Sequence, residues 1–163
     1  MKGLLMALTM AGTTVMAGQN YTLEKLAHMD QTELNTLYAQ SSTGIAPTTD
    51  TRGKAVFFPG SFLATPTTVL ASLIWQGKTF SSDGTVLMNK VFGFHAIKAK
   101  VYRGTSLFDG REATIVDYSE TSLVAGWVRD EIREVSPGVY LGRAYARTFL
   151  GPYFLLNFAL STH

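Results

Sequence analysis

The chain has 163 residues, of which 46% are hydrophobic and 16% are charged, and it contains no cysteine. This composition is too apolar for a disordered chain, and it excludes collagen, coiled-coil and disulfide-rich scaffolds. The formal net charge of +2 is too small for the electrostatic footprint of a nucleic-acid-binding protein. We therefore expect one globular unit that has no nucleic-acid partner.

Residues 1–17 have the pattern of an export signal peptide. Lys2 supplies a positive start, the following stretch to Ala17 is mostly apolar, and Val15 and Ala17 are compact enough for the cleavage-site pockets. The apolar stretch is shorter than the roughly 20 residues that span a bilayer, so a permanent anchor is the weaker interpretation. We expect an exported protein, periplasmic or secreted, that begins at Gly18 after cleavage.

Residues 22–40 have the apolar spacing of one or two short helices. Asp30 divides the segment and suits the N-cap of the second helix, because Glu33 three residues later completes a capping-box pattern. Residues 41–53 are rich in turn-forming residues and predict a loop. We expect residues 18–52 to pack outside the main domain or over one end of it, as one globular unit with residues 53–163.

From residue 53 onward the sequence predicts a mainly β domain. Turn signals such as Asp109-Gly110, Pro137-Gly138 and Gly151-Pro152 separate apolar stretches by reversals so short that neighbouring strands must be antiparallel. Such a meander avoids exposed edges by curling up, so we expect a lipocalin-like barrel. The expected strands are residues 53–58, 85–92, 94–103, 111–118, 123–135, 139–148 and 153–160, with one helix at 66–74.

Side-chain alternation distinguishes the last two strands from the others. Alternation in residues 153–160 places Phe154, Leu156 and Phe158 on one face, yet the opposite face is also apolar. A strand that is apolar on both faces needs a cover on its outer side, and the N-terminal helices are the natural cover.

Residues 127–135 depart most from a barrel pattern, because charged side chains alternate onto both faces of the expected strand. One interpretation is a polar anchor, in which Arg129 and Arg133 bind the headgroup of a ligand while apolar walls hold its tail. The alternative is a solvated edge or a buried ion-pair network that fixes the strand register. The expected ligand-binding residues are Arg129, Arg133, Tyr140, Trp127, Phe154 and Phe158.

Two further groups have both a functional and a structural interpretation. Asp117 and Glu131 are candidates for a catalytic carboxylate pair, with Arg129 as electrostatic stabiliser, if their pKa values are pushed apart. The structural alternative is a polar strand end. Trp75, which follows the expected short helix, either closes the base of the core or stacks on a ligand.

The sequence gives no support for a metal or cofactor. His28, His95 and His163 are scattered, without cysteine or a close carboxylate at metal-ligand spacing. Phosphate-binding, dinucleotide-binding and nucleophile-elbow motifs are also missing from the sequence. We therefore expect neither a metal site nor a bound cofactor.

Trp75 beside Gly77, together with the run of hairpins through Tyr140-Leu141-Gly142 and residues 154–160, resembles a lipocalin-type, or calycin-like, small secreted bacterial β-barrel. The signature of that family is G-x-W near the first strand, and Leu73 here stands in the place of the glycine. The same two residues are similar to part of the G-x-W-x-G motif of other bacterial domains. Either resemblance implies an interior cavity for a hydrophobic small molecule and assigns no catalytic residue.

Three functions follow as hypotheses. The first is an exported carrier that holds a hydrophobic or amphipathic molecule, such as a fatty acid or related lipid, in a barrel cavity with a charged anchor. The second is a cofactor-free isomerase, cyclase or hydrolase that uses the carboxylates and arginine named above in the same pocket. The third is an interaction module, with peripheral contact with the cell envelope, which requires Phe149, Tyr153 and Phe154 to be exposed.

Overall fold

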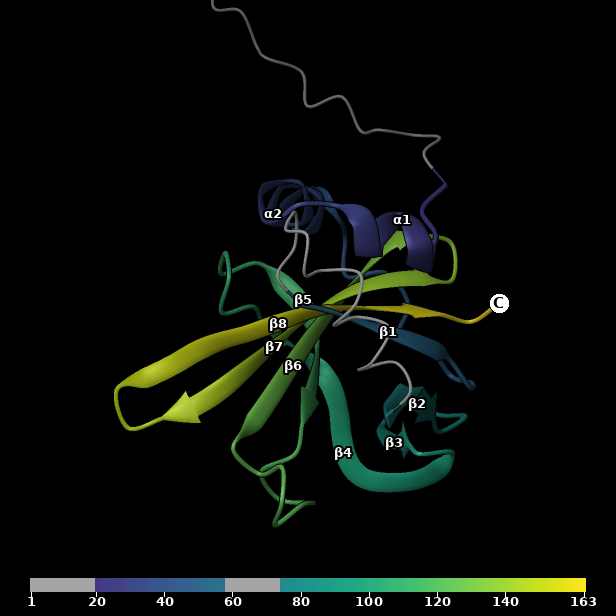
Figure 1. The fold of residues 1–163 in the computed structure, drawn as a ribbon. Helices are drawn as coiled ribbons and strands as arrows, with labels where there is room; N and C mark the ends of the chain where they lie inside the picture. Colours follow the sequence, from purple (N-terminus) through teal and green to yellow (C-terminus); the bar gives the residue numbers. More distant parts are fainter. Residues whose placement is uncertain (1–19, 58–73) are drawn as a thin grey trace, which may run out of the picture.

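The fold is an antiparallel β-barrel with two short helices on one side (Figure 1). A computed structural model describes residues 20–57 and 74–163. Within these two ranges no helix is long and apolar enough to cross a membrane. The elements are α1 (Leu23–His28), α2 (Gln31–Gln40), β1 (Arg52–Val56), β2 (Trp75–Phe80), β3 (Val86–Val91), β4 (Phe94–Thr105), β5 (Glu112–Asp117), β6 (Val128–Ser136), β7 (Val139–Thr148) and β8 (Gly151–Ser161).

The strands form one sheet in the order β1-β8-β7-β6-β5-β4-β3-β2, and every pairing is antiparallel. The sheet curls until its two ends nearly meet. The amide of Thr51, just before β1, donates to the carbonyl of Lys78 in β2 at 2.9 Å, and the amide of Phe80 donates to the carbonyl of Thr49 at 3.1 Å. The predicted fold class, a meander that closes into a barrel, is confirmed.

Glycine at two positions lets β1 and β2 approach each other. A Cβ atom on Gly77 would lie 2.3 Å from the carbonyl oxygen of Thr51, and one on Gly53 would lie 2.6 Å from the Cα atom of Gly77. Gly77 also has φ +128°, a conformation that residues with a side chain rarely adopt. The barrel closes at this seam because both strands lack a side chain there.

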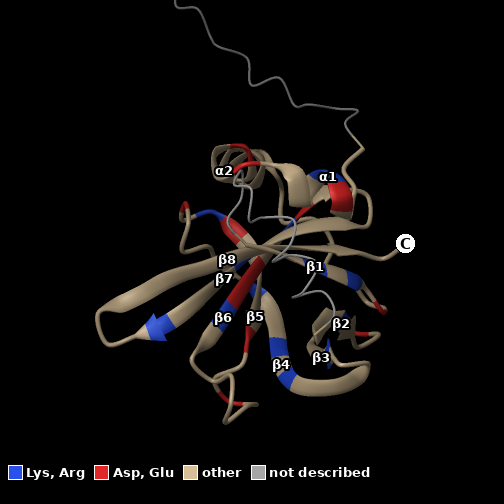
Figure 2. Cartoon of the chain, viewed as in Figure 1, with Lys and Arg blue, Asp and Glu red and all other residues tan. Residues whose placement is uncertain are grey.

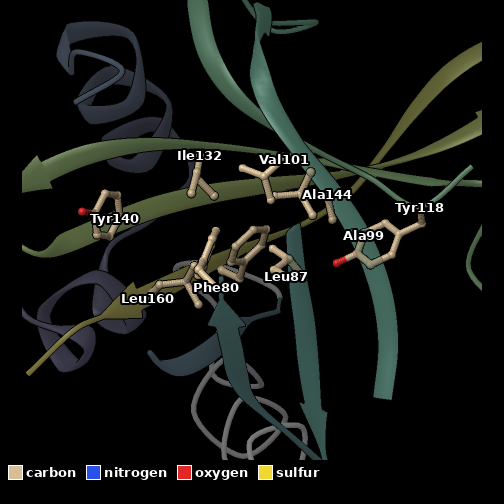
Figure 3. Close-up of a cluster of buried hydrophobic side chains, with 11 residues drawn as sticks. Phe80, Leu87, Ala99, Val101, Tyr118, Ile132, Tyr140, Ala144 and Leu160 are labelled. Carbon is tan, nitrogen blue, oxygen red and sulfur yellow. The ribbon is translucent and has the colours of Figure 1, made fainter. Parts of the chain in front are cut away.

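Two hydrophobic layers stabilise the fold. The first fills the barrel interior, where side chains such as Leu87, Val101, Ile132 and Leu160 gather between the strands (Figure 3). The second lies between the helices and the outer faces of β1, β7 and β8, and it includes Leu34 and Leu141. The helices therefore cover part of the barrel wall from outside, as the doubly apolar strands predicted.

The helix prediction for residues 22–40 is confirmed in its details. Two helices form, and Asp30 caps α2, since its side chain accepts from the amide of Glu33 while the Glu33 side chain accepts from the amide of Asp30. This reciprocal pair satisfies two amides that no helical carbonyl can reach.

The strand prediction differs from the structure in two places. Residues 75–80 form a further strand, β2, where the sequence predicted no strand and Trp75 was expected either to close the base of the core or to stack on a ligand. The strand expected at 123–135 begins only at Val128, because Ser119–Trp127 forms consecutive turns in which the amide of Ser122 donates to the carbonyl of Tyr118 at 3.0 Å. The expected signal peptide and the expected helix, apart from Ile74, lie outside the described residues.

A substitution at the barrel seam tests this closure. Gly77→Ala is expected to lower the free energy of unfolding by about 2–3 kcal/mol, because the new Cβ meets the Thr51 carbonyl and the backbone is strained as well. Urea denaturation of both proteins measures the difference.

Gly110→Ala is the matched control for this substitution. Gly110 also has a positive φ, +73°, but a Cβ atom added there would have none of the described residues within 4 Å. Its substitution is expected to cost about 1 kcal/mol from backbone strain alone. Equal losses in the two variants would show that close approach at the seam contributes nothing.

Candidate functional site

The barrel contains a cavity of about 360 Å³ with mostly apolar walls. This volume lies within the range of roughly 300–1,000 Å³ that is usual for small-molecule sites. Phe57, Ile74 and Leu156 are partly or largely exposed, whereas the polar lining residues are buried, so the polar groups lie at the deep end. The residues that line the cavity are Ala55, Phe57, Ile74, Trp75, Lys78, Asn89, Tyr118, Asp130, Ala144, Leu156 and Phe158.

Lys78 is the central residue of the deep end. Its side chain is 2% exposed, and its Nζ atom donates to Asp130 Oδ2 at 2.8 Å, to the Tyr118 hydroxyl at 2.6 Å and to Asn89 Oδ1 at 2.9 Å. An ammonium group has three donors, and each has an acceptor here. The positive charge of the lysine is therefore balanced by one buried carboxylate, and the cluster as a whole is neutral.

Tyr118 and Asn89 complete this buried cluster. The Tyr118 hydroxyl donates to Asp130 Oδ2 at 3.0 Å and accepts from Asn89 Nδ2 at 3.0 Å. Burial, followed by the negative charge of Asp130, raises the pKa of Tyr118 well above its usual value. The phenol is therefore held in its protonated, hydrogen-bond-donating form. Trp75 Nε1 donates to Asn89 Oδ1 at 3.0 Å, which fixes the indole at the cavity wall.

Aromatic rings surround the lysine ammonium on its apolar sides. Nζ lies 5.4 Å from the ring centroids of both Trp75 and Tyr118 and 5.2 Å from that of Phe158. The negative faces of such rings stabilise a cation that has lost its water. Trp75 and Phe158 also meet edge to face at 5.6 Å, so they form one continuous aromatic wall next to the ammonium.

Local irregularities in two strands bring these residues to one place. The pairing of β2 with β3 shifts register between Trp75 and Gly77, so both Trp75 and Lys78 face the interior although they are three residues apart. The pairing of β3 with β4 shifts beside Asn89, where Ile97 adopts φ +57° and its carbonyl accepts from Asn89 Nδ2 at 3.0 Å. A β-branched residue in this conformation is strained, and here the strain accompanies the orientation of a site amide.

The charged strand β6 divides its side chains between two environments. Asp130 faces the cavity, while Arg129, Glu131 and Arg133 lie on the outer face. Figure 2 shows this mixture of charges along β6. The inward charge of this strand is therefore the carboxylate of Asp130, whereas Arg129 or Arg133 was expected there. The cationic partner of Asp130 is Lys78, which comes from β2 across the barrel.

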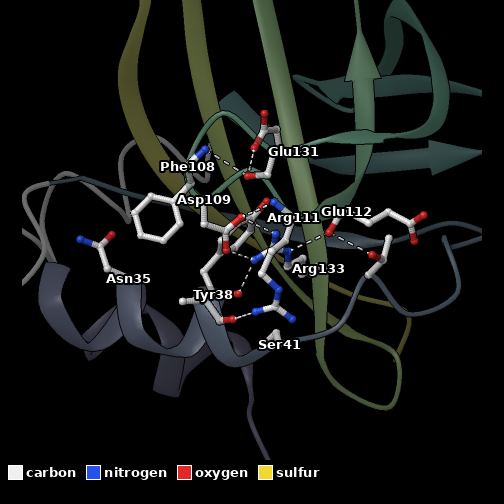
Figure 4. A network of polar contacts seen from close by, with 12 residues as sticks. Asn35, Tyr38, Ser41, Phe108, Asp109, Arg111, Glu112, Glu131 and Arg133 are labelled. Atoms are coloured by element: carbon white, nitrogen blue, oxygen red, sulfur yellow. Dashed lines mark hydrogen bonds and ion pairs between the residues drawn. The ribbon is translucent and has the colours of Figure 1, made fainter.

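Arg133 holds the helical layer to the outer face of the barrel (Figure 4). Its guanidinium binds both carboxylate oxygens of Asp109 at 2.7 Å, donates to the carbonyl of Tyr38 in α2 at 2.9 Å, and stacks on the Tyr38 ring at 4.4 Å. These contacts use one face and the edges of the guanidinium to join the β4–β5 loop, α2 and β6. They match the structural interpretation of this strand, a buried ion-pair network.

The expected catalytic group also lies on the outer face. Arg129 meets Glu131 at 3.1 Å, and Glu131 accepts from Ser106 Oγ at 2.6 Å and from the amide of Leu107 at 2.8 Å. Asp117 instead pairs with Arg147 at 2.8 Å. The structure thus brings Arg129 to Glu131, but each carboxylate is held by its own partners, and none of these three residues lines the cavity.

Among the other expected ligand-binding residues, Phe158 lines the cavity. Tyr140 is in the interior layer, where its hydroxyl donates to the carbonyl of Ile45 at 2.9 Å, and burial, followed by Glu134, raises its pKa to about 12. Trp127 is 52% exposed in the turn before β6. These two side chains do not reach the cavity lining.

Phe154 lies on the other face of β8 from Phe158, contrary to simple alternation. The pairing of β7 with β8 shifts between Ala144 and Tyr145, so that Leu155 is an extra residue on β8. Phe154 consequently packs edge to face on Tyr145 at 5.8 Å and under the Arg143 guanidinium at 4.6 Å, on the outer side.

No sequence motif indicated Lys78, Asn89 and Tyr118 as site residues. The one available signal was the spacing of Lys78 and Phe80, which share a face if residues 75–80 are read as a strand. Among residues 20–57 and 74–163, no cluster of three or more His, Cys, Asp or Glu side chains has the arrangement of a metal site.

Comparison with known proteins supports the fold. A protein from Thermomonospora curvata, known from its crystal structure, superposes on this chain with a TM-score of 0.54 and 18% sequence identity, over 83% of this chain and 89% of its own. No family model matches the sequence, and no curated protein matches it. At this identity the likeness shows the β-barrel fold alone, and the lipocalin-type assignment stays a prediction.

Asp117 gives the outer face a pH dependence. Burial raises the pKa of this carboxyl, but hydrogen bonds from Ser119 and Tyr102 and the charge of Arg147 outweigh it and hold the pKa at about 2. Because the folded-state pKa lies below the unfolded one, the stabilisation is present above about pH 4 and is lost as the pH falls towards 2.

Asp117→Asn is expected to remove this contribution, which is on the order of 2 kcal/mol at pH 6. The difference in unfolding free energy between the wild-type protein and the variant should then shrink towards zero at pH 2, as measured by urea denaturation over this range. Glu120→Gln, at an exposed carboxylate, is the control and should follow the wild-type curve. A difference that stays constant with pH would contradict this account.

Proposed function

We propose that the protein is an exported small-molecule carrier that holds a hydrophobic or amphipathic ligand in the barrel cavity. The observation that carries the proposal is a cavity with apolar walls that ends in a buried, fully hydrogen-bonded polar cluster. Apolar walls stabilise a bound ligand in proportion to the apolar surface area that binding removes from water. A few fixed polar groups at one end orient the ligand. Export rests on residues 1–17, whose sequence pattern is that of a signal peptide.

The charge balance of the cluster selects the polar end of the ligand. A carboxylate entering the site would gain Lys78 but would also face Asp130, which is already paired with that lysine. A neutral oxygen, such as that of an alcohol, aldehyde or ketone, can replace Asn89 Oδ1 or the Tyr118 hydroxyl as the acceptor of one lysine N–H without separating the ion pair. The charged anchor is thus Lys78 with Asp130, and it favours an uncharged headgroup over a fatty-acid carboxylate.

A substitution that fills the cavity tests the carrier proposal. N-phenyl-1-naphthylamine is the fluorescent probe, and decan-1-ol and decanoate compete with it at neutral pH. Decan-1-ol is expected to displace the probe at lower concentration than decanoate. Ala144→Leu adds atoms to the cavity wall and is expected to weaken probe binding by about tenfold or more.

Phe149→Ser is the control, because this side chain is 96% exposed and does not line the cavity. Probe binding to this variant should equal that of the wild-type protein. Binding that survives Ala144→Leu and is lost in Phe149→Ser would place the probe on the outer surface and overturn the carrier proposal.

A second candidate function is contact with the cell envelope, and the turn between β7 and β8 favours it. Phe149 and Leu150 at this turn are 96% and 86% exposed, and Tyr153 beside them is 67% exposed. Adjacent exposed aromatic and aliphatic side chains at the tip of a hairpin are suited to the interfacial region of a bilayer.

This second candidate predicts that the protein sediments with vesicles of phosphatidylethanolamine and phosphatidylglycerol. Phe149→Ser combined with Leu150→Ser is expected to reduce the bound fraction at least about fivefold, because it removes the apolar area that enters the interface. Phe94→Ser, at an exposed phenylalanine of the β3–β4 hairpin, is the control. Equal sedimentation of all three proteins would remove the envelope contact from consideration.

A further inference from the structure

The Lys78–Asp130 pair has the geometry for covalent capture of a carbonyl compound. We propose that Lys78 reacts reversibly with the carbonyl carbon of a hydrophobic aldehyde or ketone in the cavity to form an iminium ion, with Asp130 as the group that accepts and returns protons. This inference rests on the carrier function proposed above and specifies the class of ligand.

Lys78 meets the geometric requirement, because it belongs to the cavity wall. The cavity on its apolar side is bounded by Trp75 and Phe158, whose rings lie 5.2–5.4 Å from Nζ. A hydrophobic chain in the cavity therefore presents its polar end to this nitrogen. The other lysines within residues 20–57 and 74–163 do not line this cavity; they are Lys25, Lys54, Lys90, Lys98 and Lys100.

The chemical requirement is removal of one proton, since an ammonium group has no lone pair with which to attack. Asp130 Oδ2 lies 2.8 Å from Nζ and can accept this proton directly. Both side chains are buried, at 2% and 7% exposed, so bulk water does not compete with Asp130 for this proton.

The steps balance without an external reagent. Lys78 gives a proton to Asp130, and its lone pair then forms a C–N bond as the carbonyl oxygen takes that proton back from Asp130. The nitrogen returns a second proton to Asp130. The C–O bond then breaks, the departing hydroxyl leaves as water with this proton, and the nitrogen lone pair forms the C=N bond.

The iminium product has the same charge as the lysine ammonium that it replaces. The iminium nitrogen carries the same single positive charge as the original ammonium, next to the same Asp130 carboxylate and the same aromatic rings. No charge is created or lost in the interior, so the reaction avoids the cost of an unpaired buried ion. Tyr118, held protonated, continues to donate its hydrogen bond to Asp130.

Reductive trapping of the full-length protein tests the proposal. The protein is incubated with decanal and sodium cyanoborohydride at neutral pH, which converts an iminium into a stable secondary amine. Intact-mass measurement is expected to show the gain of one decyl group, and peptide mapping should place it on Lys78. Lys78 should be labelled at least about tenfold faster than Lys98 and Lys100, whose side chains are solvent-exposed.

Asp130→Asn tests the proton-transfer role of the carboxylate. Asparagine cannot accept the lysine proton, so labelling of Lys78 is expected to fall at least about tenfold, while Phe149→Ser, whose substitution lies outside the cavity, should be labelled at the wild-type rate. Far-UV circular dichroism establishes that the variant is folded. Peptide mapping of the wild-type chain needs no variant, so the assignment to Lys78 does not depend on this result.

Every outcome of these measurements decides one of the two proposals. Selective labelling of Lys78 supports imine formation. Displacement of the probe by decan-1-ol without labelling, or with labelling spread over the exposed lysines, overturns imine formation and leaves the carrier function standing. Failure of decan-1-ol to displace the probe, with no labelling of Lys78, overturns both.

Discussion

The ion pair between Lys78 and Asp130 is the constraint around which the interior of this barrel is organised. It joins β2 to β6, which are separated by three strands in the sheet order, so it crosses the interior rather than following a ladder. A lysine in an apolar interior is costly unless its charge and all three donors are satisfied. The carboxylate, the phenol of Tyr118 and the amide of Asn89 meet this need, and each must be held in one position to do so.

This requirement explains irregularities in the sheet that would otherwise only weaken it. The register shift in β2 turns Trp75 and Lys78 to the same side, and the strained backbone at Ile97 directs a carbonyl to Asn89. Each departs from regular strand geometry at the polar end of the cavity. The opposite wall, where the helices pack on the outer faces of β7 and β8, has register shifts of its own in the pairings of β6 with β7 and of β7 with β8. At the polar end of the cavity, the irregular backbone orients the site residues.

The sequence predicted the barrel because its turn signals and alternation act over short distances. It predicted the capping box at Asp30 for the same reason. It did not reveal the polar cluster, because Lys78, Tyr118 and Asp130 come from three separate segments and meet only when the sheet closes. A bulge is also invisible to a period-two pattern, and this is why Phe154 was expected beside Phe158 and lies on the other face. Arg129 and Arg133 were expected to bind a ligand headgroup because they are charged residues in an apolar sequence. Their partners lie on the outer face of the barrel.

The burial of β7 has a consequence for the dynamics of the molecule. Val139–Ala146 are eight consecutive buried residues, with the barrel interior on one side and the helical layer on the other. Strand β4, by contrast, exposes many of its side chains to solvent. Amide protons exchange with deuterium as fast as their surroundings open, so we expect β7 and its two neighbours to form the slow-exchanging unit of the fold. We consequently expect opening motions to be concentrated in β2, β3 and β4, a wall that neither α1 nor α2 covers, and this wall carries the lysine.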